Sequence, residues 1–312
     1  MTSSAATSAQ DSRVARGIGF ALLSYACFST ADAMVKLSSA HFSVFQIAFT
    51  LSVFALIPVL VLTRGHGGLR ALRPTLPKLV LMRALLTSAC ALLVWQAFGM
   101  MPLADGYAIL FASPILVTAL SVPLLGEQVG WRRWAASGVG FLGVLIMIRP
   151  DFATVGLGHL FVLLGAGLGA LSFIVLRKMG PHEKSAPILF SLFFTIALVT
   201  APFAFTSFVM PTAGELFVLA MAGLLQGAGQ TGLVLATRDA PAVIVAPFQY
   251  SQMLWAVLFG VTVFGDSPAP VLFLGLGIVV ASGLYTLWRE TVRRRPVTLT
   301  LGRGEVPARA AR

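Results

Sequence analysis

The sequence predicts an all-α polytopic membrane protein whose ten transmembrane helices form two inverted five-helix repeats. Of the 312 residues, 57% are hydrophobic and 11% are charged, whereas soluble domains carry about 25% charged residues. Apolar runs of about 20 residues recur along the chain, the length at which a helix crosses a bilayer core. Residues of the second half also repeat residues of the first half at a constant offset of 139 positions.

The predicted helices follow the apolar runs. They span residues 17–36, 42–62, 79–99, 104–125, 131–149, 157–176, 187–208, 214–236, 242–264 and 269–288. The first five form a repeat over 17–149, and the last five form a repeat over 156–288. Residues 1–16 are small and polar and are predicted to be a disordered cytoplasmic tail, and residues 289–312 form an Arg-rich cytoplasmic tail.

The constant offset carries the prediction of a repeat. It links Gly17 to Gly156, Met82 to Met221, Pro102 to Pro241, Gly126 to Gly265 and Gly138 to Gly277. Because each half has an odd number of helices, the second half must enter the membrane from the opposite face. Residues 13–33 could also be read as a cleavable signal peptide, but the Gly17–Gly156 pair favours a retained first helix.

Lys and Arg in the loops predict the orientation. Outside the C-terminal tail, one side of the membrane carries Arg13, Arg16, Arg64, Arg70, Arg73, Lys78, Arg132, Arg133, Arg177, Lys178, Lys184 and Arg238. The other side carries Lys36 and Arg149. This asymmetry predicts a multi-pass protein of the bacterial inner membrane with both termini in the cytoplasm.

Charge and motif content exclude several function classes. The net charge is +11, and the basic residues lie between the apolar runs. We therefore attribute them to the orientation of the helices in the membrane rather than to nucleic-acid binding. Cys27 and Cys90 fall inside apolar helices, which does not indicate a disulfide framework. The sequence has no nucleophile triad, phosphate loop or metal-spaced His/Cys cluster. We therefore expect a lipid bilayer and a small molecule as partners, with no enzymatic activity, cofactor or bound metal.

Ionisable groups inside the helices are the first candidate site residues, because their burial in a membrane is costly. Arg83 is expected about one turn inside the cytoplasmic end of its helix, where it either reaches the interface or anchors an anion. Asp32 and Lys36 are spaced for an i,i+4 ion pair. If Asp32 instead faces a cavity, it is the candidate site for proton or cation coupling.

Amides and aromatic rings supply the remaining candidates. Thr87 aligns with Gln226 at the 139-residue offset, and Gln230 extends the same face; these residues either line a cavity or bond neighbouring helices. Further candidate substrate contacts are Trp95, Gln96, Tyr107, Ser113, Gln249, Tyr250 and Gln252. Aromatic rings and amides together suit stacking and edge recognition of a planar metabolite, although Trp95 could also belong to an interfacial belt.

Glycines mark two kinds of structural position. Gly126-Glu127 and Gly265-Asp266 are predicted joints, in which glycine ends one helix and the acid lies near the start of the next. Glycines at 165 and 169, and at 223 and 227, have the spacing of close helix contacts. We expect both sets to be scaffold rather than substrate contacts.

The chain resembles the EamA family of drug/metabolite transporters at residues 103–105, 124–127 and 140–144. Residues 31–36 and 82–86 resemble a bacterial branch that includes riboflavin and S-adenosylmethionine uptake proteins. The resemblance implies an inner-membrane secondary carrier with a central cavity, lined mainly by helices within 17–36, 79–99, 104–125, 157–176, 214–236 and 242–264. The family more commonly has a glutamate at the second joint. This chain has Asp266 there, which carries the same negative charge.

The expected function is secondary transport of a small polar organic metabolite by alternating access, with uptake of a heteroaromatic compound such as riboflavin or S-adenosylmethionine. One alternative is export of amino acids or metallophore-like metabolites, as in other members of the family. Another is a non-transporting membrane enzyme or assembly subunit. The inverted repeat favours the carrier, and the sequence predicts no oligomeric state.

Overall fold

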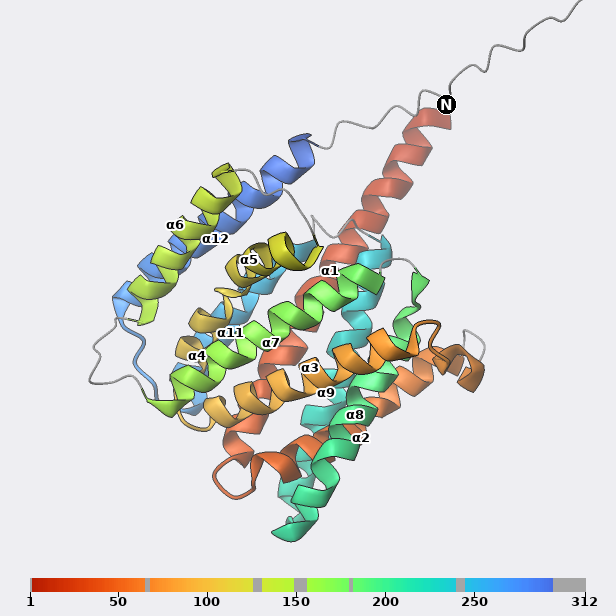
Figure 1. Ribbon diagram of the computed structural model, residues 1–312, viewed down its shortest axis with the longest axis vertical. Coiled ribbons are helices and arrows are strands. Elements are labelled where there is room, and N and C mark those ends of the chain that lie inside the picture. Colours follow the sequence, from red (N-terminus) through yellow and green to blue (C-terminus); the bar gives the residue numbers. More distant parts are fainter. Residues whose placement is uncertain are drawn as a thin grey trace, which may run out of the picture.

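The computed structural model describes residues 2–64, 68–125, 131–148, 156–179, 182–239 and 245–293, and its regular elements in these ranges are all helical. Figure 1 shows their arrangement in space. The elements are α1 (Thr2–Ser38), α2 (Val44–Arg64), η1 (Gly68–Leu72), α3 (Pro77–Phe98), α4 (Leu103–Leu110), α5 (Ser113–Leu125), α6 (Trp131–Ile148), α7 (Leu157–Met179), α8 (Ser185–Thr206), α9 (Ala213–Asp239), η3 (Ala246–Tyr250), α11 (Ser251–Val263) and α12 (Pro270–Arg293).

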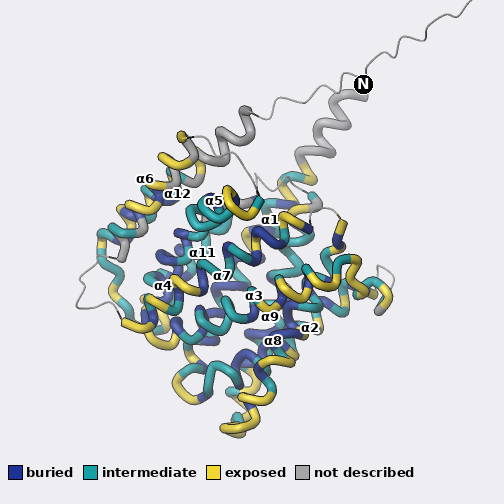
Figure 2. The backbone as a smooth tube through the Cα atoms, viewed as in Figure 1, coloured by how far each residue is buried: buried dark blue, intermediate teal, exposed yellow. Residues whose placement is uncertain are grey.

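Helical segments long and apolar enough to cross a bilayer dominate the chain. In the described ranges there are seven, namely Ser12–Ser38, Val44–Arg64, Pro77–Phe98, Leu103–Leu125, Leu157–Met179, Ser185–Thr206 and Ala213–Thr237. Many large apolar side chains on these helices are exposed, and Figure 2 shows exposed positions along the outer faces of the bundle. The protein is therefore a polytopic α-helical membrane protein. The count of ten transmembrane helices stays a prediction.

Helices from the two halves of the chain pack on one another. Helix α1 packs on α9, α3 packs on α7, and α2 packs on both α8 and α9. Helices α6 and α12 pack together and lie at one edge of the molecule (Figure 1). The main apolar core draws residues from α1, α2, α3, α4, α8, α9, α11 and α12. The two halves therefore fold as one body.

Close helix contacts form at the glycine faces predicted from spacing. A Cβ added at Gly223 or Gly227 would lie 2.3 Å from the carbonyl oxygen of Leu51 or Ala55 on α2. A Cβ at Gly165 would lie 2.8 Å from a methyl group of Val94 on α3. Only glycine allows such approaches, so the prediction of close packing at these positions is confirmed.

Two of the predicted helices are each divided into two pieces. The range 104–125 contains α4 and α5, separated by a turn at Phe111 and Ala112. Pro114 has no N–H to donate to the carbonyl of Leu110, and the Ser113 hydroxyl donates to that oxygen instead. In the range 242–264, the 3₁₀ helix η3 precedes α11, and the Ser251 hydroxyl donates to the carbonyl of Phe248. The prediction of two continuous helices was wrong.

The first helix begins earlier than predicted. Helix α1 starts at Thr2, so the prediction of a disordered tail over residues 1–16 was wrong. Alanines in this stretch favour a helix, and extending an existing helix avoids the cost of nucleation.

Candidate functional site

Asp32 on α1 is a buried carboxylate shared by three helices. Asp32 is 8% exposed. The indole Nε1 of Trp95 on α3 donates a hydrogen bond to Oδ1 over 3.2 Å. The hydroxyl of Tyr107 on α4 donates to Oδ2 over 2.5 Å. We name Asp32, Trp95 and Tyr107 the central cluster.

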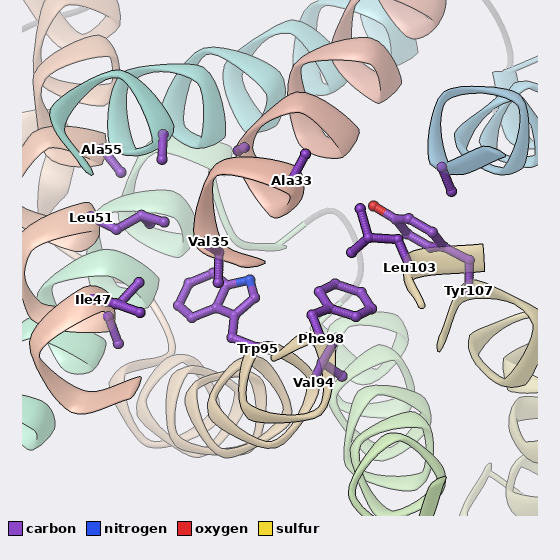
Figure 3. Packing of buried hydrophobic residues seen from close by; sticks show 14 of the residues in the cluster. Ala33, Val35, Ile47, Leu51, Ala55, Val94, Trp95, Phe98, Leu103 and Tyr107 are labelled. Atoms are coloured by element: carbon purple, nitrogen blue, oxygen red, sulfur yellow. The ribbon is translucent and has the colours of Figure 1, made fainter. Parts of the chain in front are cut away.

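The two donors approach α1 from different sides in the close-up view, Trp95 from below and Tyr107 from the right (Figure 3). Figure 3 shows the Trp95 indole and the Tyr107 phenol on either side of Phe98, both turned toward the turn of α1 that carries Ala33. Trp95 is 4% exposed and Tyr107 is 2% exposed. The interpretation of Trp95 as part of an interfacial belt was therefore wrong, because such a ring would lie at the surface.

A buried hydroxyl on α1 lies beside the central cluster. The Oγ of Ser29 is buried and has no hydrogen-bond partner in the described part of the chain, and Ser29 lies one helical turn before Asp32 on α1. Ser29 and Gln252 both lie near the Tyr107 phenol. Buried polar atoms are ordinarily bonded, so this part of the bundle retains unused hydrogen-bonding capacity.

Aromatic rings gather at the two helix breaks. The rings of Phe98 and Tyr107 have centroids 5.4 Å apart. Phe111, at the break after α4, lies edge-on to Tyr250, at the end of η3, with centroids 5.2 Å apart. The two breaks are thus in direct contact through aromatic side chains.

Lys36 does not pair with Asp32. Its Nζ lies 3.6 Å from Oδ2 of Asp266 and 4.4 Å above the ring of Phe264. Gly265, just before Asp266, has a φ of +68°, a conformation in which glycine commonly ends a helix. The second joint therefore contacts the end of α1, whereas the first joint, Gly126-Glu127, lies outside the described residues.

Thr87 is used in helix packing. Its hydroxyl lies 2.6 Å from the hydroxyl of Ser172 on α7 and also donates to the carbonyl of Arg83. These contacts match the interhelical alternative for Thr87 rather than a free cavity-lining hydroxyl.

Arg83 and Gln226 keep polar atoms without partners. The Nε of Arg83 and the Oε1 of Gln226 are buried, and neither has a hydrogen-bond partner within the ranges that the structure describes. Gln230 lies one turn beyond Gln226 on α9 and is partly buried.

The other predicted substrate contacts are dispersed. Gln96 follows Trp95 and is partly buried, but successive helix positions point about 100° apart, so it does not share the direction of Trp95. Ser113 bonds the backbone at the break. Gln249 and Gln252 flank the junction of η3 and α11 and are partly buried. The structure joins Asp32, Trp95 and Tyr107 directly and leaves Gln96 apart from them.

Polar side-chain contacts tie α1 and the loop after it to α9 near both ends of the bundle. The guanidinium of Arg16 donates to both carboxylate oxygens of Asp239 over 2.7 and 2.8 Å, and this contact lowers the pKa of Asp239. Beyond the other end of α1, Nδ1 of His41 lies 2.8 Å from Oε1 of Glu215. The sequence alone did not predict either pair, and it did not predict Ser29 as a neighbour of Asp32. The i,i+3 spacing of Ser29 and Asp32 was the one signal that could have indicated their proximity.

Comparison with known proteins identifies the family. The EamA-like transporter family matches residues 15–149. A riboflavin transporter of Rhizobium johnstonii is 30% identical over 285 residues, which cover 90% of this chain and 91% of that protein. An S-adenosylmethionine uptake transporter of Rickettsia prowazekii is 25% identical over 274 residues, covering 88% and 93%.

The fold is also similar to that of a solved structure. A crystal structure with 16% sequence identity superposes with a TM-score of 0.63, covering 91% of this chain and 99% of that chain. Both curated relatives are named as transporters, in agreement with the absence of enzyme motifs from the sequence. The match over residues 15–149 and the 30% identity along nearly the whole chain show that the protein is a member of the EamA-like transporter family.

Proposed function

We propose that this transporter takes up a small heteroaromatic metabolite, such as riboflavin or S-adenosylmethionine, across the bacterial inner membrane. The observation that carries the proposal is the central cluster, a buried carboxylate held by an indole and a phenol where α1, α3 and α4 meet. Rings near the two helix breaks suit stacking on a planar compound. The names of the relatives from Rhizobium johnstonii and Rickettsia prowazekii support these two candidate substrates.

The transport mechanism that we infer is alternating access by two inverted repeats. The helix breaks support it, because α5 begins at Ser113 and α11 begins at Ser251, within one residue of the 139-residue offset. Broken helices commonly hold the binding site of secondary transporters. Figure 1 is consistent with inversion, since α1 and its counterpart α7 run in opposite directions across the view.

Contacts between α6 and α12 also support a two-fold relation. A Cβ at Gly140 would approach Ser282, and a Cβ at Gly143 would approach Val279. Adding the offset of 139 to either glycine gives the residue that the other glycine meets. Such reciprocal pairing is the signature of a two-fold axis, here within one chain.

The proposed orientation has Arg16 and Asp239 at the cytoplasmic end and Lys36 and Asp266 at the outer end. It rests on the Lys and Arg asymmetry of the loops. The ion pair of Lys36 with Asp266 and the burial of the central cluster support a state in which the outer side of the site is closed. We assign proton or cation coupling to Asp32, because a carboxylate inside a membrane protein commonly belongs to such a pathway.

Uptake by the purified protein in proteoliposomes tests the proposal. Labelled riboflavin and labelled S-adenosylmethionine are supplied outside, and uptake is compared with that of empty liposomes. Asp32→Asn, which keeps the shape and removes the charge, is expected to reduce uptake at least about tenfold, since buried charged hydrogen bonds contribute about 1.5–3 kcal/mol.

The matched control is Asp239→Asn, which removes a carboxylate at the end of the bundle and is expected to retain most of the uptake. Equal uptake by Asp32→Asn and the unchanged protein would remove Asp32 from the site. Efflux from preloaded liposomes without uptake would favour the exporter alternative, and movement of neither compound in either direction would reject both candidate substrates.

A further inference from the structure

Arg83 on α3 is a cation without an anionic partner among the described residues. Within the part of the chain that the structure describes, its buried Nε–H donates no hydrogen bond, and no carboxylate lies at salt-bridge distance from its guanidinium. Five of the other described carboxylates are already engaged: Asp32 with Trp95 and Tyr107, Glu183 with the N–H of Leu76, Glu215 with His41, Asp239 with Arg16, and Asp266 with Lys36. A sixth, Asp105, lies at the start of α4, in the neighbourhood of Lys36 and His159 rather than of Arg83. Arg83 is partly buried, and an unpaired charge withdrawn from water is unfavourable, so an anion from outside the chain would stabilise this position.

The direction of the Arg83 side chain disfavours a lipid phosphate as that anion. On the same stretch of α3, Leu81, Met82 and Leu85 are 54%, 43% and 47% exposed, so they mark the lipid-facing side. At about 100° per residue, Arg83 lies about 150° from the centre of that side. It therefore points into the bundle, toward α7, where Thr87 one turn further on meets Ser172.

The position of Arg83 along α3 separates it from the central cluster. It lies twelve residues before Trp95, or about 18 Å along the helix axis, and six residues after Pro77, or about 9 Å. Arg83 thus belongs to the half of the bundle in which α1 begins. A compound that moves along α3 between Asp32 and that end of the bundle would pass both groups.

We propose that Arg83 binds the oxyanion, a carboxylate or a phosphate, of the transported metabolite. The guanidinium presents a planar fork of donors that matches either group in a bidentate manner. The substrate is then an oxyanion-bearing heteroaromatic compound such as S-adenosylmethionine, which has a carboxylate, rather than uncharged riboflavin. This inference rests on the proposed uptake function and narrows its substrate class.

Transport of a pair of probes that differ only in the carboxylate tests the proposal. The probes are S-adenosylmethionine and decarboxylated S-adenosylmethionine, measured in proteoliposomes of phosphatidylcholine. The unchanged protein is expected to prefer the carboxylated probe at least about tenfold. In Arg83→Gln that preference falls to about one, and Arg83→Lys, which keeps the charge but not the fork, retains part of it.

The matched control is Lys78→Gln, which removes an exposed cation from the first turn of the same helix and keeps the preference of the unchanged protein. Equal preference for the carboxylated probe in Arg83→Gln and in the unchanged protein would overturn the proposal. So would faster transport of riboflavin than of S-adenosylmethionine by the unchanged protein.

A binding experiment separates failure of this inference from failure of the proposed function. Thermal unfolding in phosphatidylcholine nanodiscs is followed with sodium phosphate or with sodium chloride at equal ionic strength. Phosphate is expected to raise the midpoint of the unchanged protein and not that of Arg83→Gln, even if neither probe is transported. An equal rise in both proteins would overturn the oxyanion site. If phosphatidylglycerol raises the midpoint through Arg83 and abolishes the effect of phosphate, the occupant is a lipid and the substrate assignment is wrong.

Discussion

Asp32 illustrates how a single residue acquires a role that its neighbours in sequence do not determine. Its spacing to Lys36 predicts an ion pair, but the two side chains bind Tyr107 and Asp266 instead. The donors to Asp32 come from positions 63 and 75 residues away. An indole and a phenol orient the carboxylate without neutralising it, so the charge remains available to a cationic group or a proton.

We expect Tyr107→Phe to weaken this arrangement measurably. The substitution removes one of the two donors to a buried carboxylate and should lower the free energy of unfolding by about 1–3 kcal/mol, together with the rate of uptake. Unfolding in a titration with SDS, and uptake in proteoliposomes, measure the two effects.

Tyr25→Phe is the matched control for this substitution. Tyr25 is a buried tyrosine on α1 that packs edge-on to Phe28, and within the described residues its hydroxyl has no hydrogen-bond partner that would be lost. If both phenylalanine variants change stability and uptake equally, the bond between Tyr107 and Asp32 has no special role.

At the scale of helices, the sequence predicts where helices occur better than it predicts where a helix is interrupted. Helical structure occurs in the described part of each of the ten predicted ranges, because long apolar runs carry a strong signal. The breaks near Phe111 and Tyr250 were missed, although Pro114 and Pro247 could have indicated them. Apolar residues continue through both breaks, so hydrophobicity alone cannot reveal where the backbone changes its hydrogen bonds.

Glycine spacing, in contrast, predicted a contact between helices that are distant in sequence. Gly227→Ala is expected to destabilise the packing of α9 on α2, because the new Cβ would lie 2.3 Å from the carbonyl oxygen of Ala55. Forcing an atom into such a contact typically costs about 1–3 kcal/mol. The midpoint of unfolding in SDS measures the loss.

Gly167→Ala provides the comparison, because a Cβ at this position of α7 would have no atom within 4 Å. Replacing glycine by alanine inside a helix stabilises it by roughly 0.5–1 kcal/mol when space permits. The two variants should therefore shift the midpoint in opposite directions. A shift of the same sign would contradict the described contact between α9 and α2.

The whole molecule combines two pairs of helices that each join the halves of the chain. The Arg16–Asp239 ion pair and the contact of His41 with Glu215 hold α1 and the loop after it against α9, and glycines bring α3 and α7 together. The central cluster links these pairs, since Asp32 belongs to α1 and Trp95 belongs to α3. Two such units could tilt against each other about the cluster, as alternating access requires.

Sequence reasoning reached the family, the fold class and three residues that meet at the centre. It could not show which candidates meet, because that depends on which face each helix presents to its neighbours. Thr87 and Gln226 align in the repeat, yet Thr87 bonds Ser172 while the Oε1 of Gln226 has no partner. Equivalent positions in the two halves therefore make different contacts.

Distances between spin labels at the two ends of the bundle test alternating access most directly. One pair joins Lys78 on α3 to Thr237 on α9, and the other joins Met100, just after α3, to Gly214 on α9; all four positions are exposed. The account predicts that a transported substrate lengthens one distance and shortens the other. If a compound that the protein demonstrably transports changes neither distance, or changes both in the same direction, the two-repeat mechanism is wrong.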